Sequence, residues 1–220
     1  MKKVRDNNAL SFRFLHLFLN LTRCSPVTAG LMALFLVFSS CSKSVNLSTR
    51  AFVQTGDNVI IGGFIVQGTE VKRVIIRAIG PELTQYGIAD VLANPRLELH
   101  DGNGALIGTN DDWQTTILGG IITSNQVSDI QASGHAPTAA SESAIIADLP
   151  PGNYTAIVRG VNNTAGVALV EVYDLNFTAS SSLGNVSTRS LVQTDEHVMI
   201  RGFIVRGAEP KPGDYSRHWS

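Results

Sequence analysis

Short runs of alternating apolar and polar residues recur along most of this 220-residue chain. A period of two residues, with many β-branched side chains and turn residues between the runs, is typical of half-buried strands. Strands are predicted at residues 48–54, 59–67, 72–79, 97–100, 105 onward, 143–149, 154–160 and 168–175. Eight short strands predict an all-β fold, an antiparallel β-sandwich of the jelly-roll type.

The clearest local signal is a hairpin over Arg96–Trp113. Leu97 and Leu99 alternate with polar residues, and Asp101-Gly102-Asn103-Gly104 supplies a tight turn before the returning strand. Asn110-Asp111-Asp112 follows that strand, so the hairpin carries a cluster of side-chain oxygens at one end.

Two stretches of the chain have nearly the same sequence. Residues 46–72 and 185–211 are identical at 16 of 27 aligned positions, with Asn46 matching Asn185. The second copy begins at Asn185, a whole domain's length along the sequence after Asn46. So long an offset indicates a domain-sized module in tandem. The sequence therefore predicts a complete module at 46–178, a Ser-rich linker at 179–184 and a truncated second copy at 185–220.

The second copy carries apolar strand residues without the later strands of the module. Val198, Ile200, Phe203 and Ile204 need a partner surface, so the copy is expected to dock on a sheet edge or to aggregate. A frameshifted reading frame is one explanation of its shortness. The other is that it packs on the first module or on another chain.

Residues 1–41 read as an export leader. The apolar run at 26–38 is short for a membrane span and fits a signal-peptide core after Arg23. Phe38-Ser39-Ser40-Cys41 resembles the lipobox of bacterial lipoproteins, which implies lipidation of Cys41. The alternatives are an uncleaved anchor or ordinary cleavage near Cys41. The expected location is the outer membrane, as a lipoprotein, or the extracellular space.

Composition narrows the classes of partner. Residues 1–41 carry a net charge of +4, and the rest of the chain carries −5. A mildly acidic body argues against nucleic acid and leaves contact with a membrane to a lipid anchor or the N-terminal segment. Both cysteines precede residue 42, so the body holds no disulfide, thiol catalyst or cysteine-zinc site.

Residues 97–174 resemble the bacterial pre-peptidase C-terminal domain, a secreted β-sandwich. The resemblance rests on the hairpin described above, on Glu142 leading to Leu149-Pro150-Pro151-Gly152-Asn153-Tyr154, and on the strand around Val170. The segment before it is similar to a module found in tandem in exported bacterial proteins. Together these resemblances imply an accessory domain rather than an enzyme.

Calcium is the sharpest chemical hypothesis, because Ca²⁺ takes six to eight oxygen ligands. The candidate ligands are Asp101, Asn103, Asn110, Asp111, Asp112 and Glu142. Some members of the resembled family bind calcium through this region. Asx-turn hydrogen bonding explains the same residues without a metal, so both interpretations stay open.

The sequence gives weaker support to the other candidate sites. Trp113 is a candidate contact for a sugar or polymer, whereas Tyr154 and Tyr173 are expected in the core. Lys72, Arg73 and Arg77 are expected on a solvated strand face. The chain has no Gly-x-Ser-x-Gly, His-Glu-x-x-His or phosphate-loop motif, which disfavours an enzyme.

The sequence thus predicts a non-catalytic, exported interaction or spacer module at the cell surface, with calcium as its only candidate cofactor. The first alternative is an accessory domain that binds a carbohydrate or another polymer. The candidate partners are an extracellular polysaccharide or a protein. A secreted hydrolase is the second alternative.

Overall fold

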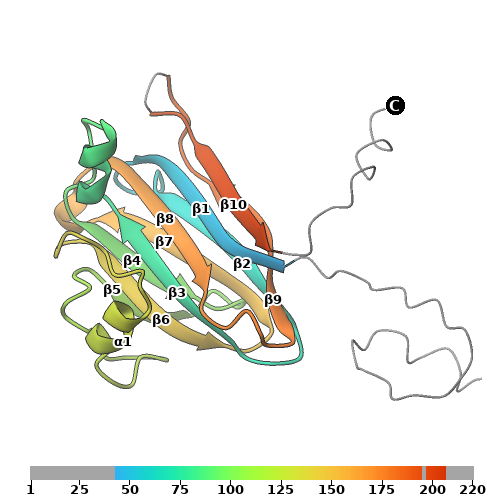
Figure 1. Ribbon diagram of the computed structural model, residues 1–220. Coiled ribbons are helices and arrows are strands. Elements are labelled where there is room, and N and C mark those ends of the chain that lie inside the picture. Colours follow the sequence, from blue (N-terminus) through green and yellow to red (C-terminus); the bar gives the residue numbers. More distant parts are fainter. Residues whose placement is uncertain (1–42, 195–196, 207–220) are drawn as a thin grey trace, which may run out of the picture. The chain divides into compact units, whose positions relative to one another are not determined.

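The computed structural model describes residues 43–194 and 197–206 and confirms the all-β fold (Figure 1). The strands are β1 (Lys43–Val53), β2 (Ile60–Gly68), β3 (Lys72–Ile79), β4 (Pro95–His100), β5 (Leu106–Asn110), β6 (Ser143–Leu149), β7 (Gly152–Gly160), β8 (Gly166–Asp174), β9 (Ser181–Arg189) and β10 (Ile200–Arg206). The helical elements of this part of the chain are short: α1 (Val127–Ala132) and the 3-10 helices η1 (Pro81–Tyr86) and η2 (Val161–Asn163).

The strands form two antiparallel sheets of five, packed as a sandwich. One sheet has the order β5-β4-β7-β2-β9, and the other has the order β10-β1-β8-β3-β6. A single residue pair, Ser44 with Leu183, links β1 to β9, so strand pairing continues from one sheet to the other at this side.

The first eight strands correspond to the eight that alternation predicts. They alone give the orders β5-β4-β7-β2 and β1-β8-β3-β6, which are the two sheets of a jelly roll. This arrangement leaves β1 and β2 at the sheet edges. The second repeat supplies β9 and β10, which pair with these two edges.

The main core lies between the sheets and includes a side chain from the segment predicted as a linker. Phe64, Val158 and Val170 pack there with Leu183 of β9, which is 2% exposed. Ser181, expected in a linker, is also buried and begins β9. Residues 181–184 are therefore part of the fold instead of a solvated connection.

A second apolar layer covers the outer face of β3 and β6. Trp113 and Ile130 of α1 pack there on Ile75 and Ile146. The segment between β5 and β6, which includes α1, supplies this cover at the lower left of Figure 1.

The prediction of one solvated face for Lys72, Arg73 and Arg77 is wrong for Lys72 and for Arg77, whose side chain is only 14% exposed and pairs with Glu171. The Lys72 ammonium group is fully buried, 2.9 Å from Asp174 Oδ2 and 2.6 Å from the carbonyl oxygen of Asn176. Successive strand residues point to opposite faces, so Lys72 turns away from the side on which Arg73 pairs with Asp129 and Asp148.

Candidate functional site

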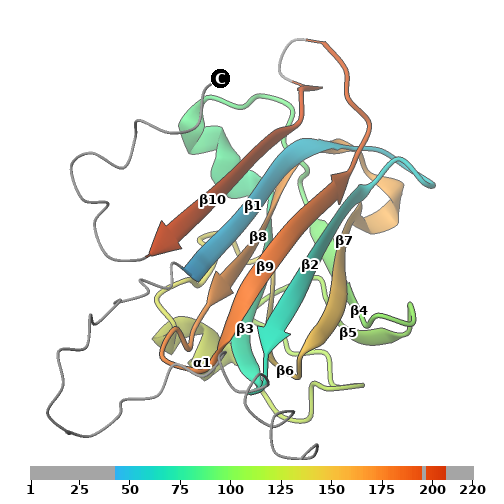
Figure 2. The ribbon, with the colours of Figure 1, turned by 90° about the vertical axis from the view of Figure 1, so that its right-hand side faces the viewer.

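The two copies of the repeat pair reciprocally, and this contact is the most distinctive feature of the molecule. The first strand of each copy pairs with the second strand of the other: β1 with β10, and β9 with β2. Figure 2 shows β10, β1, β9 and β2 side by side. Within a copy, the two strands are not neighbours in a sheet but lie in opposite sheets.

Both pairings use the same register. Leu47 faces Phe203, and the equivalent residues Val186 and Phe64 also face each other. Six of the seven residue pairs between β1 and β10 recur between β9 and β2 at the equivalent positions of the two copies. An irregularity interrupts each pairing, between Ser44 and Asn46 in β1 and, one residue along the repeat, between Gly184 and Val186 in β9. The repeat interface is therefore self-complementary, like that of a twofold homodimer.

Equivalent residues meet on the axis of this internal symmetry. The hydroxyl oxygens of Thr49 and Thr188, which occupy the same position in the two copies, lie 3.0 Å from each other. Phe52 and Leu191, also equivalent, form an isolated bridge. Thr49 is 2% exposed, so its hydroxyl meets its own counterpart away from solvent.

The second glycine of the repeated strand allows the close approach of the exchanged partner. A Cβ atom on Gly63 would overlap the Ser187 hydroxyl oxygen, and one on Gly202 would lie 2.8 Å from that of Ser48. The same glycine–serine contact thus occurs twice. The sequence predicts either a bulge or close packing at Gly62-Gly63, and the structure shows close packing at Gly63.

A groove of about 390 Å³ lies where β10 meets the outer face of its sheet. Its lining includes Asn46, His135, Tyr173, Phe177 and Ile204. Both repeats contribute to the groove, since Asn46 belongs to β1 and Ile204 to β10.

The polar groups beside this groove satisfy one another. Arg77 Nε donates to Glu171 at 2.7 Å, and the Tyr173 hydroxyl donates to the same carboxylate at 2.9 Å. His135 stacks on the Tyr173 ring with centroids 4.1 Å apart, and the Arg77 guanidinium lies 5.3 Å from that ring's centroid. These contacts reduce the surface of the Tyr173 ring on which a sugar could stack.

Burial sets the protonation of this cluster. Burial, followed by repulsion from Glu171, raises the pKa of Tyr173. Burial and the neighbouring Arg77 lower the pKa of His135. Burial lowers the pKa of Arg77, but attraction to Glu171 and Tyr173 outweighs it and the pKa is raised overall. At neutral pH the cluster is therefore a salt bridge beside a neutral imidazole and a neutral phenol.

In the loop that was the candidate calcium site, Asp101 makes an Asx turn. Its Oδ1 accepts hydrogen bonds from the backbone N–H groups of Asn103 and Ala105, each at 2.9 Å. Asn103 is exposed. This is the turn chemistry that the sequence offers as the alternative to a metal.

Asn110 and Glu142 are buried and bonded to the backbone. The Asn110 amide donates to the carbonyl oxygens of Asp112 and Thr115, and its Oδ1 accepts from the N–H of Ala144. Glu142, 0% exposed, accepts from the N–H groups of Gly80, Glu82 and Ala139 at 2.8–3.2 Å. Burial raises the pKa of Glu142 against the lowering effect of these three donors.

The remaining candidates, Asp111 and Asp112, are half-buried beside Asn110. In the part of the chain that the structure describes, no three His, Cys, Asp or Glu side chains form a group that could hold a metal ion. The structure thus brings Asn110, Asp111 and Asp112 together but gives Asp101 and Glu142 separate backbone partners.

Trp113 lies in the core and not on a binding surface. It is 5% exposed, packs with Ile75 and Ile130, and donates from its indole N–H to the carbonyl oxygen of Ala139 at 3.1 Å. Its buried position therefore argues against the predicted contact with a sugar or polymer. Tyr154 is buried as expected, and its ring stacks on Phe64.

The leader and Cys41 lie outside the described residues. Among the residues that are described, no helix has the length and apolar character needed to cross a bilayer.

No protein-family model matches the chain, and a search of curated proteins finds no match. The resemblance to the pre-peptidase C-terminal domain therefore stays a prediction. Its motifs fall on the β4–β5 hairpin, on β6 and β7, and on β8.

A double-mutant cycle tests the internal symmetry axis. We expect Thr49→Val and Thr188→Val each to lower the free energy of unfolding, because each leaves one hydroxyl without its partner in a partly buried contact. The double variant should lose less than the sum, with a coupling of about 0.5–1.5 kcal/mol by chemical denaturation. Strictly additive losses would show that the two hydroxyls do not interact.

Glu142→Ala tests the role of the buried carboxylate. We expect a loss of about 2–5 kcal/mol in the free energy of unfolding, because backbone N–H donors lose their acceptor. Glu82→Ala is the matched control, since the Glu82 carboxylate bonds to Thr138 at an exposed position and should cost under about 1 kcal/mol. Equal losses would contradict a special role for Glu142.

The melting temperature in calcium chloride and in a chelator tests the metal hypothesis directly. We expect no difference, because the oxygens of Asp101, Asn110 and Glu142 already accept backbone hydrogen bonds. A rise in calcium that Asp111→Ala with Asp112→Ala abolishes would instead establish a calcium site, since a ligand of the native state raises stability by mass action.

Proposed function

We propose that this chain is a non-catalytic, exported interaction or spacer module whose successive repeats are joined by strand exchange. The reciprocal pairing of β1 with β10 and of β2 with β9 carries this proposal. Each repeat completes a sheet of its neighbour, so the repeats are connected by two strand pairings as well as by the peptide chain. A linear series of such modules would form a continuous extended structure.

The use of charged residues supports a structural role. Lys72 with Asp174 and Arg77 with Glu171 are internal ion pairs on neighbouring strands of one sheet. Removing one partner of a buried ion pair leaves an uncompensated charge and is strongly destabilising, so each pair favours the observed contact between β3 and β8. The groove beside Tyr173 likewise has its polar groups directed to one another.

Export and surface location come from the sequence. The leader ending at Cys41 and the resemblance of residues 97–174 to a secreted accessory domain both support a module that works outside the cytoplasm. Calcium is not required by this proposal, because the buried hydrogen-bond network around Glu142 is complete without it.

Polymer binding is the second candidate, and one observation favours it. The groove of about 390 Å³ presents Phe177, 53% exposed, together with Ile204. The buried Trp113 and the stacked Tyr173 ring weaken this candidate, because they reduce the aromatic surface on which a sugar would stack.

Hydrogen exchange on the full chain tests the strand exchange. We expect the amides of β9 and β10 to be protected to nearly the same degree as those of β1 and β2, because the four strands form one cooperative unit. Exchange of β9 and β10 at a much lower opening free energy would reduce the second copy to a loosely attached tail and contradict the proposal.

A variant sharpens this test. Gly202→Val places a branched side chain against the Ser48 hydroxyl, so protection should fall in β1 as well as in β10. Ile200→Val is the matched control, because Ile200 is 49% exposed and the change keeps a β-branched residue in the strand.

A further inference from the structure

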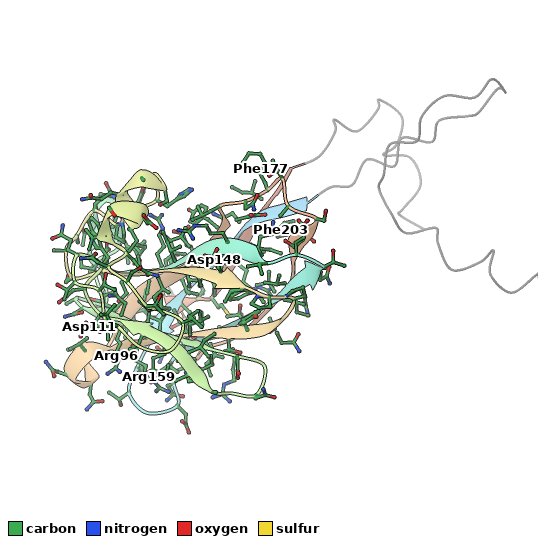
Figure 3. All side chains as sticks on the ribbon, turned by 90° about the horizontal axis from the view of Figure 1, so that it is seen from below. Arg96, Asp111, Asp148, Arg159, Phe177 and Phe203 are labelled. Atoms are coloured by element: carbon green, nitrogen blue, oxygen red, sulfur yellow. The ribbon has the colours of Figure 1, made fainter. Side chains whose placement is uncertain are left out.

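Strand β10 is an edge strand with a large apolar surface. One of its edges pairs with β1, and no described residue pairs with the other edge. Phe203 is 73% exposed, Ile204 54% and Ile200 49%. Figure 2 shows β10 at the outer side of the four strands, and Figure 3 shows Phe203 at the side of the molecule away from Asp111. An edge of this kind is a template for a further strand.

The internal repeat shows what such an edge accepts. β10 is the second-copy counterpart of β2, and Phe203 is the counterpart of Phe64. Phe64 is only 3% exposed, although the two residues occupy the same register position opposite Val186 and Leu47. The strand β2 has two neighbours, β9 and β7, whereas β10 has only the equivalent of the first among the described strands.

The strand β7 contributes directly to the burial of Phe64, which also packs in the core between the sheets. It pairs antiparallel with β2, and Tyr154 faces Phe64 with ring centroids 5.7 Å apart. Transferred to the equivalent positions of the second copy, this register places Tyr154 opposite Phe203, Ile157 opposite Ile200 and Asn153 opposite Ile204.

We propose that the open edge of β10 binds a strand with the sequence of β7, supplied by a further copy of the repeat in which no strand of its own occupies the β2 edge of that β7. The proposal rests on the strand exchange proposed above and names the next partner in that series. The incoming strand adds main-chain hydrogen bonds along β10, and its tyrosine covers Phe203. The sheet that contains β1 then gains a strand from the next module, just as the sheet that contains β2 already gains β9.

An intact second copy of this chain is not the expected occupant. Its own β7 lies between β2 and β4, with both edges paired. A copy could meet β10 through one of its edge strands, β5, β6 or β10. None of these is β7, and a contact through its own β10 would bring two phenylalanines together without a tyrosine. The register seen at β2 thus favours a β7-type strand over self-association.

A synthetic peptide of residues 150–160, labelled with a fluorophore, tests the proposal on the full chain. We expect saturable binding by fluorescence anisotropy and new hydrogen-exchange protection at the β10 amides. Phe203→Ser in the chain, or the change of Tyr154 to Ser in the peptide, should weaken binding by about tenfold or more, because each removes a large apolar contact. Leu118→Ser is the matched control, since Leu118 is 63% exposed but lies outside β10.

Two results would overturn the proposal. One is absence of peptide binding while the amides of β9 and β10 are protected, which would leave the strand exchange intact and show that the open edge does not accept β7. The other is a dimer in sedimentation experiments that Phe203→Ser dissociates, which would identify a second copy as the occupant. Unprotected β9 and β10 amides would instead remove the strand exchange on which the proposal rests, so the two failures are distinguishable.

Discussion

The fold depends on two antiparallel strand pairings that are copies of each other. β1 with β10 and β9 with β2 share one register, one glycine–serine contact and one axis at Thr49 and Thr188. A sequence that pairs well with its own duplicate needs no separately evolved partner surface. The same hydrogen bonds and side-chain contacts stabilise both sheets, so the interface is used twice within a single chain.

This arrangement solves a problem that the jelly roll creates. Its strand order leaves β1 and β2 at the edges of the two sheets. Without the second repeat, these edge strands would carry unpaired backbone groups and apolar residues such as Phe64. Exposed edges of this kind promote association with other chains. The second repeat covers both, and Leu183 enters the core at the point where the sheets join. The chain thus uses association between its own repeats in place of association with unrelated chains.

Most of the fold is predictable from the sequence, because alternation identifies β1 to β8 and the duplication identifies β9 and β10. The partner of each repeated strand is not predictable, because identical sequences are compatible with pairing inside a copy or between copies. Composition assigns Ser181 to a linker, yet it is buried because β9 begins there. Composition gives the polarity of a residue, whereas its burial depends on which other parts of the chain pack against it.

The candidate site residues also fall into two groups, those whose contacts are predictable from the local sequence and those whose contacts depend on the topology. Asp101 behaves as local turn chemistry predicts, since its partners are two and four residues away. Glu142, Trp113 and Lys72 have partners far away along the chain, as in the contact of Lys72 with Asp174, so their roles depend on topology. No motif precedes or follows Lys72 that would mark it as buried.

The position of the first and last paired residues has a mechanical consequence. Lys43, where β1 begins, faces Arg206, where β10 ends, so both ends of the described body leave it at the same end of one strand pair. A force that separates these two points would open the β1–β10 ladder one hydrogen bond at a time, as a zipper opens. When two paired strands are pulled along their length, all their hydrogen bonds bear the force together. When they are pulled apart from one end, the hydrogen bonds break one after another. The β1–β10 pairing is therefore loaded from one end whenever the body is pulled at Lys43 and Arg206.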